Sequence, residues 1–219
     1  MDAHPESGLG PVLTALASSA VATSFDPRPP GAATLIGTVL DSAVCTSGVL
    51  DNAAPEAAAH TAALAKREAT FVTLQRDGRL RGCVGTLTAL RPLGIDVVRN
   101  ARLAARDPRL PPVEAAEVGS LRITVTILSP SEPIAVRAFT TLLDHLRPGR
   151  DGLTLKDTGG RRATFLPSVW ASLPEPDRFV TALLRKGRWP RHLWTTELRS
   201  AAWPEDLAAE RYAAREFAA

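Results

Sequence analysis

The dipeptide Asp77-Gly78, placed between two apolar segments, is the feature that most limits how this chain can fold. Both residue types tolerate the positive φ angles of a two-residue turn, so the sequence predicts a β-hairpin over residues 70–87. The expected pairs are Arg76 with Arg79, Leu74 with Arg81, and Val72 with Cys83. Since side chains alternate along a strand, Arg81 and Cys83 are predicted on one face.

The second strand of this hairpin contains the residues that could take part in a reaction, in the segment Arg81-Gly82-Cys83-Val84-Gly85-Thr86. A guanidinium near a thiol favours the thiolate, which is the nucleophilic form. The glycines leave backbone groups that a ligand can approach closely. The same residues also have a purely structural interpretation, in which Cys83 packs as a small apolar side chain and the glycines mark a bulge.

The basic residues are dispersed along the chain rather than clustered. The formal net charge of the 219 residues is only +3, and no run of five or six basic residues occurs. A nucleic-acid-binding protein normally concentrates its basic residues on one face. We therefore do not expect nucleic acid as a partner, unless the fold assembles such a face from distant arginines.

Cysteine and histidine usage argues against a metal site. The two cysteines, Cys45 and Cys83, and the four histidines show no ligand spacing, so we predict no metal. The sequence also has no Walker-type loop, no Gly-x-Gly-x-x-Gly and no His-Glu-x-x-His motif. Nucleotide hydrolysis, a Rossmann cofactor and metalloprotease activity are not expected, and the residues identify no other cofactor.

The apolar segment over residues 8–25 has the composition of a packed helix rather than of a secretory signal. Asp2 and Glu6 precede it and no lysine or arginine does, whereas a signal peptide begins with positive charge. No run of 18 apolar residues predicts a membrane span. We expect a cytoplasmic protein without a membrane partner, in which a reducing environment keeps Cys83 as a thiol.

The order of elements predicts an α+β fold. Residues 1–8 are expected to be disordered and residues 9–64 to form a helical region that packs on the rest of the chain. Strands and helices then alternate through short turns without a regular βαβ pattern, which favours a largely antiparallel or mixed sheet with flanking helices. The expected elements are the hairpin, a helix over 92–106, a strand over 121–128, a second hairpin over 153–166 and a helix over 176–186.

A proline-rich loop, Asp107-Pro108-Arg109-Leu110-Pro111-Pro112, is the second dense feature. Its prolines hold the backbone rigid, so Arg109 could present a planar fork to a carboxylate or phosphate. Alternatively, Asp107 and Arg109 make local ion pairs in a structural linker. A third segment, Phe165 to Trp170, places Ser168 near a helix start that could attract an anion, or simply contributes apolar side chains to the core.

These motifs, in this order, resemble the AMMECR-type domain, also called AmmeMemoRadiSam system protein A. The resemblance covers residues 65–217, so we assign an AMMECR-type domain to residues 65–219. It includes Leu80-Arg81-Gly82-Cys83-Val84-Gly85, the proline-rich loop, Leu128 to Ile134, Asp151-Gly152-Leu153 and Phe165 to Trp170. Residues 210–217 resemble the family's final strand.

The resemblance implies a larger and a smaller subdomain, and partners of a particular kind. Genes of this family often accompany those of a Memo-like protein and a radical S-adenosylmethionine protein. The resemblance also implies a ligand or catalytic site around the Arg-Gly-Cys motif. Its residues here are Cys83 and Arg81 as catalytic candidates, with Gly82, Gly85, Thr86, Asp107 and Arg109 as substrate-binding candidates.

Two functional hypotheses follow. In the first, the protein is an enzyme or enzyme component in which Cys83 is the nucleophile in a pocket for a small anionic substrate. Arg81 then lowers the thiol pKa or binds the anion. In the second, the hairpin and the proline-rich loop dock a Memo-like or radical S-adenosylmethionine partner, and Cys83 serves only packing. No histidine lies near the motif in sequence, which counts against cysteine-hydrolase chemistry.

Overall fold

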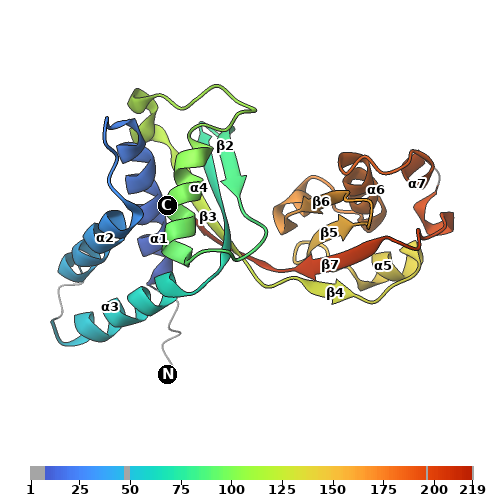
Figure 1. The fold of residues 1–219 in the computed structure, drawn as a ribbon, viewed down its shortest axis with the longest axis horizontal. Helices are drawn as coiled ribbons and strands as arrows, with labels where there is room; N and C mark the ends of the chain where they lie inside the picture. The colour runs from blue at the N-terminus through green and yellow to red at the C-terminus, as the bar shows by residue number, and fades with distance from the viewer. Residues whose placement is uncertain (1–7, 47–49, 196, 219) are drawn as a thin grey trace. The chain divides into compact units, whose positions relative to one another are not determined.

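A computed structural model describes residues 8–46, 50–195 and 197–218. The chain divides into two compact units, and the predicted α+β class is confirmed. The first unit contains the chain up to Leu128 together with the segment from Arg215, and the second contains Ser129–Ala214. Figure 1 shows the helices and strands of each unit. No helix among the described residues is long and apolar enough to cross a membrane.

The first unit is built on a four-stranded sheet in the order β2-β1-β3-β8. Its strands are β1 (Ala69–Arg76), β2 (Arg79–Gly85), β3 (Arg122–Leu128) and β8 (Ala214–Ala218). β1 pairs antiparallel with β2 and with β3. The turn between β1 and β2 has φ angles of 50° at Asp77 and 73° at Gly78, so the predicted hairpin is confirmed.

Helices pack on one side of this sheet (Figure 1). They are α1 (Leu9–Ala22), α2 (Ala32–Thr46), α3 (Leu50–Ala65) and α4 (Leu93–Ala104), with short 3₁₀ segments η1 (Thr23–Phe25) and η2 (Ala115–Ser120). α4 contacts β1 and β2, α1 contacts β3, and α2 and α3 pack outside them against α1 and α4. The helices predicted within residues 9–64 therefore form one core with the sheet.

Alternation along β1 decides which side chains enter that core. Val72 and Leu74 are fully buried beneath the helices, whereas Phe71 and Thr73 are only half-buried. Thr73 pairs with Cys83 on β2, so the two side chains share the second face.

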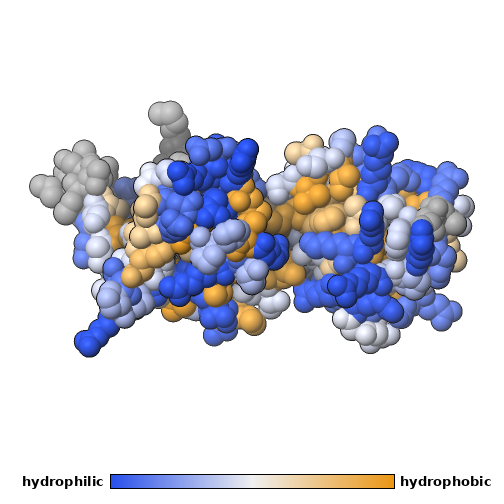
Figure 2. All heavy atoms as spheres, turned by 90° about the horizontal axis from the view of Figure 1, so that it is seen from above, coloured by the Kyte–Doolittle hydropathy of each residue, from blue (hydrophilic) through white to orange (hydrophobic). Residues whose placement is uncertain are grey.

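The second unit has its own four-stranded sheet and its own core. The strands are β4 (Glu132–Ile134), β5 (Gly152–Lys156), β6 (Arg162–Phe165) and β7 (Ala208–Tyr212), in the order β4-β7-β5-β6. The helical segments are α5 (Phe139–His145), η3 (Pro167–Ala171), α6 (Pro176–Lys186), α7 (His192–Thr195) and η4 (Leu198–Ser200). Trp170 stacks on Phe179 with ring centroids 3.8 Å apart. On the face drawn in Figure 2, hydrophobic side chains stand among hydrophilic ones.

The C-terminal segment forms strands, as predicted, although its composition favours a helix. The single strand predicted over residues 210–217 is, however, two strands that belong to different sheets. β7 pairs with β4 and β5 in the second unit, and β8 lies beside β3 in the first. Pairing with existing strands outweighs local helix propensity here. The prediction that residues 1–8 are disordered falls, up to residue 7, outside the described residues.

Candidate functional site

Cys83 lies on the edge strand β2 with its side chain partly exposed. The hydroxyl of Thr73, on the neighbouring strand, donates a hydrogen bond to the Cys83 Sγ at 3.3 Å. The sequence predicted that Cys83 pairs with Val72. This is wrong, because Cys83 pairs with Thr73 after a shift in the register of the hairpin between Leu74 and Gln75.

A bulge in β2 causes this change of register. The predicted pair Arg76 and Arg79 is confirmed, but Gln75 pairs with Leu80 and Leu74 then pairs with Gly82. Arg81 is thus the extra residue, and the predicted pair Leu74 and Arg81 is wrong. The strict alternation that was expected to place Arg81 beside Cys83 is interrupted at Arg81 itself.

Asp107 and Arg109 close the free edge of β2 at Cys83. The Cys83 N–H donates to Asp107 Oδ2 at 3.0 Å, and Arg109 Nη2 donates to the Cys83 carbonyl oxygen at 2.7 Å. Arg109 also donates to both Asp107 carboxylate oxygens, at 2.9 and 2.6 Å. The pair therefore supplies the hydrogen bonds that an additional strand would supply, and it fixes the backbone on both sides of the thiol.

The charges of this pair are unequally exposed. The Asp107 side chain is 1% exposed and that of Arg109 is 67% exposed. Hydrogen bonds from Arg109 hold the pKa of Asp107 well below its usual range, and the Cys83 N–H adds to the effect. The carboxylate thus stays charged at neutral pH, while the guanidinium remains accessible from outside.

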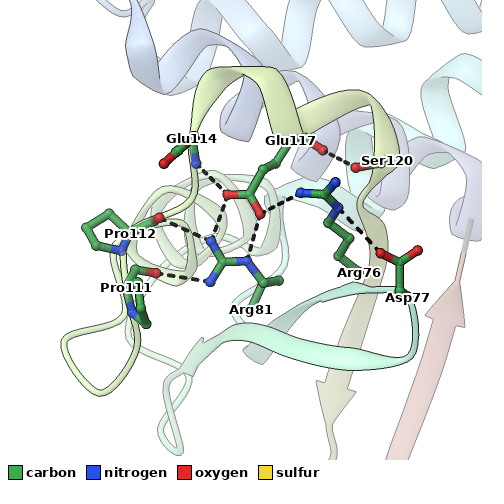
Figure 3. Close-up of polar contacts among 8 residues, drawn as sticks. All are labelled: Arg76, Asp77, Arg81, Pro111, Pro112, Glu114, Glu117 and Ser120. Carbon is green, nitrogen blue, oxygen red and sulfur yellow. Dashed lines mark hydrogen bonds and ion pairs between the residues drawn. The ribbon is translucent and has the colours of Figure 1, made fainter.

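Arg81 is held by a different set of acceptors (Figure 3). Its Nε and Nη2 donate to the two carboxylate oxygens of Glu117, at 2.9 and 2.7 Å. Its Nη1 and Nη2 also donate to the carbonyl oxygens of Pro111 and Pro112, each at 3.2 Å. Arg81 therefore fastens the proline-rich loop and η2 to the hairpin, and Glu117 balances its charge.

Glu117 is the centre of this cluster, and sequence reasoning did not identify it. Besides Arg81 it accepts hydrogen bonds from Arg76 at 3.2 Å and from the backbone N–H of Glu114 at 2.8 Å. The last contact is part of a capping box on η2, a local Glu-x-x-Glu signal that could have been found. Beside the cluster lies a cleft of about 380 Å³, lined by Arg76, Asp77, Arg79, Arg81 and Glu117.

Replacing Glu117 with Gln should remove an acid-sensitive part of the stability of the first unit. Hydrogen bonds, chiefly from Arg81, lower the Glu117 pKa from 4.5 to about 2. The folded-state pKa is the lower one, so this stabilisation is complete above the unfolded pKa and is lost as pH falls toward about 2. The difference in urea midpoint between wild type and E117Q should thus be largest at neutral pH and vanish at the acid end.

The matched control for this experiment is Asp41→Asn, since Asp41 is exposed and has no hydrogen bond in the described ranges. Its midpoint should follow that of the wild type at every pH. A difference between E117Q and wild type that stays constant from neutral to acid pH would contradict the prediction.

The two glycines of the motif are required by close packing. A Cβ at Gly82 would lie 1.9 Å from the carbonyl oxygen of Ala104, at the end of α4. A Cβ at Gly85 would lie 2.2 Å from the ring of Phe71 and 2.4 Å from the Thr70 carbonyl oxygen. The space that these glycines leave is thus filled from within the unit.

Thr86 joins a buried polar cluster beneath the hairpin. Its hydroxyl donates to Asp96 Oδ2 at 2.7 Å, and the Thr70 hydroxyl donates to the same oxygen at 2.9 Å. Asn100 Nδ2 also donates to it at 2.9 Å, and Arg91 Nη1 donates to Oδ1 at 3.3 Å. Asp96 and Asn100 are four residues apart on α4, a spacing that could have revealed a shared helix face.

Other predicted features lie apart from Cys83. Trp170 and Phe165 contribute to the core of the second unit, and Ser168 is exposed on η3. Among the described residues, no group of three or more His, Cys, Asp or Glu side chains could hold a metal ion.

The motif and loop that meet at Cys83 belong to a known family. The model of the AMMECR1 family matches residues 39–217. The chain is a member of the AMMECR1 family. The resemblance inferred from the motifs is therefore confirmed. The match begins inside α2, nearer the N-terminus than the predicted start at residue 65.

Two relatives of this AMMECR1 chain match about half or more of its length. A protein of Methanothermobacter thermautotrophicus is 38% identical over 106 residues, which are 48% of this chain and 54% of that protein. A protein of Methanocaldococcus jannaschii is 33% identical over 137 residues, or 60% of this chain and 67% of that protein. The chain thus matches about half the length of the first relative.

A solved structure has the same fold. The crystal structure of the uncharacterized protein PH0010 from Pyrococcus horikoshii covers 95% of this chain and 90% of its own, with a TM-score of 0.67. The two sequences are 23% identical, so the likeness concerns the fold alone.

Proposed function

We propose that this AMMECR1 protein acts through the thiol of Cys83, as an enzyme or enzyme component on a small anionic substrate. The observation that carries the proposal is the restraint on this one residue. A hydroxyl donates to its sulfur, and one charged pair holds its backbone N–H and carbonyl together. Reactive groups are commonly held this way by their surroundings, so that they keep one orientation.

Arg109 is the cation that we assign to the substrate. Its Nε and Nη2 donate hydrogen bonds to the Asp107 carboxylate, and Nη2 also donates to the Cys83 carbonyl oxygen. In the part of the chain that the structure describes, its Nη1 donates no hydrogen bond. A carboxylate or phosphate oxygen could bind this nitrogen from the exposed side. We do not carry this role over to Arg81, because Glu117 and two carbonyl groups use its donors.

The simplest reaction for this arrangement is addition of the thiolate to an electrophilic carbonyl carbon. The bond between Sγ and carbon forms, the π electron pair moves to the carbonyl oxygen, and that oxygen takes a proton. The proton of the thiol passes to water, so the step is balanced without an oxidant, a metal or a second protein group. A positive charge at Arg109 favours binding of an anionic substrate beside the thiol.

Alkylation of Cys83 tests this proposal. In a Cys45→Ser background Cys83 is the only cysteine, and iodoacetamide should label it in the folded protein faster than in the urea-unfolded protein. Thr73→Ala and Arg109→Gln should each slow labelling about fivefold, the effect of losing one hydrogen bond of about 1 kcal/mol. Labelling is followed by mass spectrometry across pH.

The control for Arg109→Gln is Arg99→Gln, an exposed arginine on α4, which should leave the labelling rate unchanged. If Cys83 reacts only after the protein is unfolded, the thiol cannot be the nucleophile. The proposal then fails.

Docking of a Memo-like or radical S-adenosylmethionine partner is the second candidate function. Apolar exposure near the hairpin favours it, since Leu80 is 46% exposed and Leu90 is 57% exposed. If this surface docks a partner, Leu80→Asp should abolish partner binding and Cys83→Ser should leave partner binding unchanged. Lost cellular function in Cys83→Ser with partner binding intact supports thiol chemistry, whereas full function in that variant supports docking.

A further inference from the structure

A cavity of about 530 Å³ lies among α1, α2 and α3, apart from the contacts of Cys83. Its walls are mainly small and aliphatic side chains, including Val12, Ala15, Val39, Leu40, Ala43 and Ala57. Two of its hydroxyl groups already have partners, because Thr38 donates to the Thr34 carbonyl and Ser42 to the Thr38 carbonyl. The cavity is thus apolar along its walls and has the size of a small-molecule site.

Among the described polar residues that line this cavity, His60 is the one that is buried. The residue lines the cavity and is only 6% exposed. Across the described residues nothing forms a hydrogen bond or ion pair with its imidazole. The His60 ring nitrogens are not fully enclosed, so a ligand that displaces water from them must offer a hydrogen bond in its place. A ligand with a polar end would supply the missing partner.

Glu56 lies at the same end of the cavity and restricts what that polar end can be. A Cβ built on Gly8 would lie 2.6 Å from Glu56 Oε1 and 2.7 Å from His60 Nε2, so both atoms border one small space. A neutral hydroxyl can donate to the carboxylate and accept from the imidazole N–H. A carboxylate head group would instead be repelled by Glu56.

We propose that this cavity binds a small apolar molecule that carries a single hydroxyl head group, such as an alkyl alcohol. The hydrocarbon part would fill the space between the three helices, and the hydroxyl would bond His60 and Glu56. The site does not involve Cys83. α1 and the first turns of α2 precede residue 39, where the AMMECR1 match begins, so much of this wall is outside the segment matched to the family.

Titration of the ¹⁵N-labelled full chain with 1-octanol tests this inference by NMR. Amide resonances of α1, α2 and α3 should shift in a saturable way, while those of β5, β6 and α6 in the second unit should not. Octanoate, which has the same chain length and a charged head, should bind at least tenfold more weakly. Shifts spread evenly over both units, or equal affinity for octanoate, would overturn the proposal.

Two substitutions locate the ligand. Ala15→Trp places an indole in the cavity from an exposed position of α1 and should abolish binding, whereas Ala62→Trp, on an exposed position of α3 outside the lining, should not change it. His60→Leu keeps an apolar side chain and should weaken octanol binding about fivefold, the effect of one lost hydrogen bond. Unchanged octanol affinity in either Ala15→Trp or His60→Leu would contradict the assignment.

Discussion

Replacing Gly82 with Ala should lower the free energy of unfolding of the first unit by about 3 kcal/mol. The new Cβ would lie 1.9 Å from the carbonyl oxygen of Ala104 and 2.8 Å from its carbonyl carbon. Both are backbone atoms at the end of α4, so neither can rotate aside as a flexible side chain would. Either β2 or α4 must move, and the hydrogen bond between Cys83 and Asp107 would be disturbed with it.

Urea denaturation, followed by hydrogen exchange of peptides from β1, β2 and α4, measures this effect. All four tryptophans lie in the second unit, so their fluorescence reports that unit separately. Gly119→Ala is the control, because a Cβ there meets nothing within 4 Å. It should change stability by no more than about 0.5 kcal/mol. Equal stability of the two variants would show that the contact with Ala104 yields without cost.

Replacing Asp96 with Ala should destabilise the first unit by about 3 kcal/mol as well. Asp96 is buried and is the common acceptor for Thr70, Thr86, Asn100 and Arg91. Removal of its carboxylate takes the acceptor from the hydroxyl groups of Thr70 and Thr86 and leaves a cavity in the core, while Asn100 keeps its bonds to Thr70. The buried Thr70 hydroxyl then retains its desolvation cost.

The same urea and exchange measurement applies, with Asp41→Ala as the exposed control on α2. Asp96→Asn keeps one acceptor oxygen and should lose less stability than Asp96→Ala. The prediction also has a local signature, since peptides that contain Thr86 should exchange faster. If Asp96→Ala matched Asp41→Ala, the cluster would contribute nothing measurable to stability.

The edge strand β2 is held in place by contacts of three residues, Gly82, Asp96 and Asp107. β2 is an edge strand, and its backbone would otherwise be exposed at Cys83. Close contact with α4 fixes one face, the Asp96 cluster holds the end of the strand, and Asp107 with Arg109 occupies the free edge. A thiol on such a support keeps one position, which is what the proposed chemistry requires.

Local patterns were sufficient for most elements and for the family. Asp77-Gly78 predicted the hairpin because a two-residue turn requires positive φ at both positions, and the structure has it. Alternation over residues 121–128 predicted β3, and helical spacing predicted α4 and α6. Local propensity was less informative at the C-terminus, where one predicted strand divides between two sheets.

The sequence by itself thus determined the hairpin, the α+β class and the presence of a cysteine between two glycines on a strand. Only the tertiary structure decided that Arg81 is bulged and bound to Glu117, 36 residues away, and that Asp107, 24 residues from Cys83, bonds the backbone N–H of that cysteine. The physical reason is the separation along the chain over which each kind of interaction acts. Turn and alternation preferences act between near neighbours, whereas the partners of a charged side chain depend on which distant segments the packed core brings beside it.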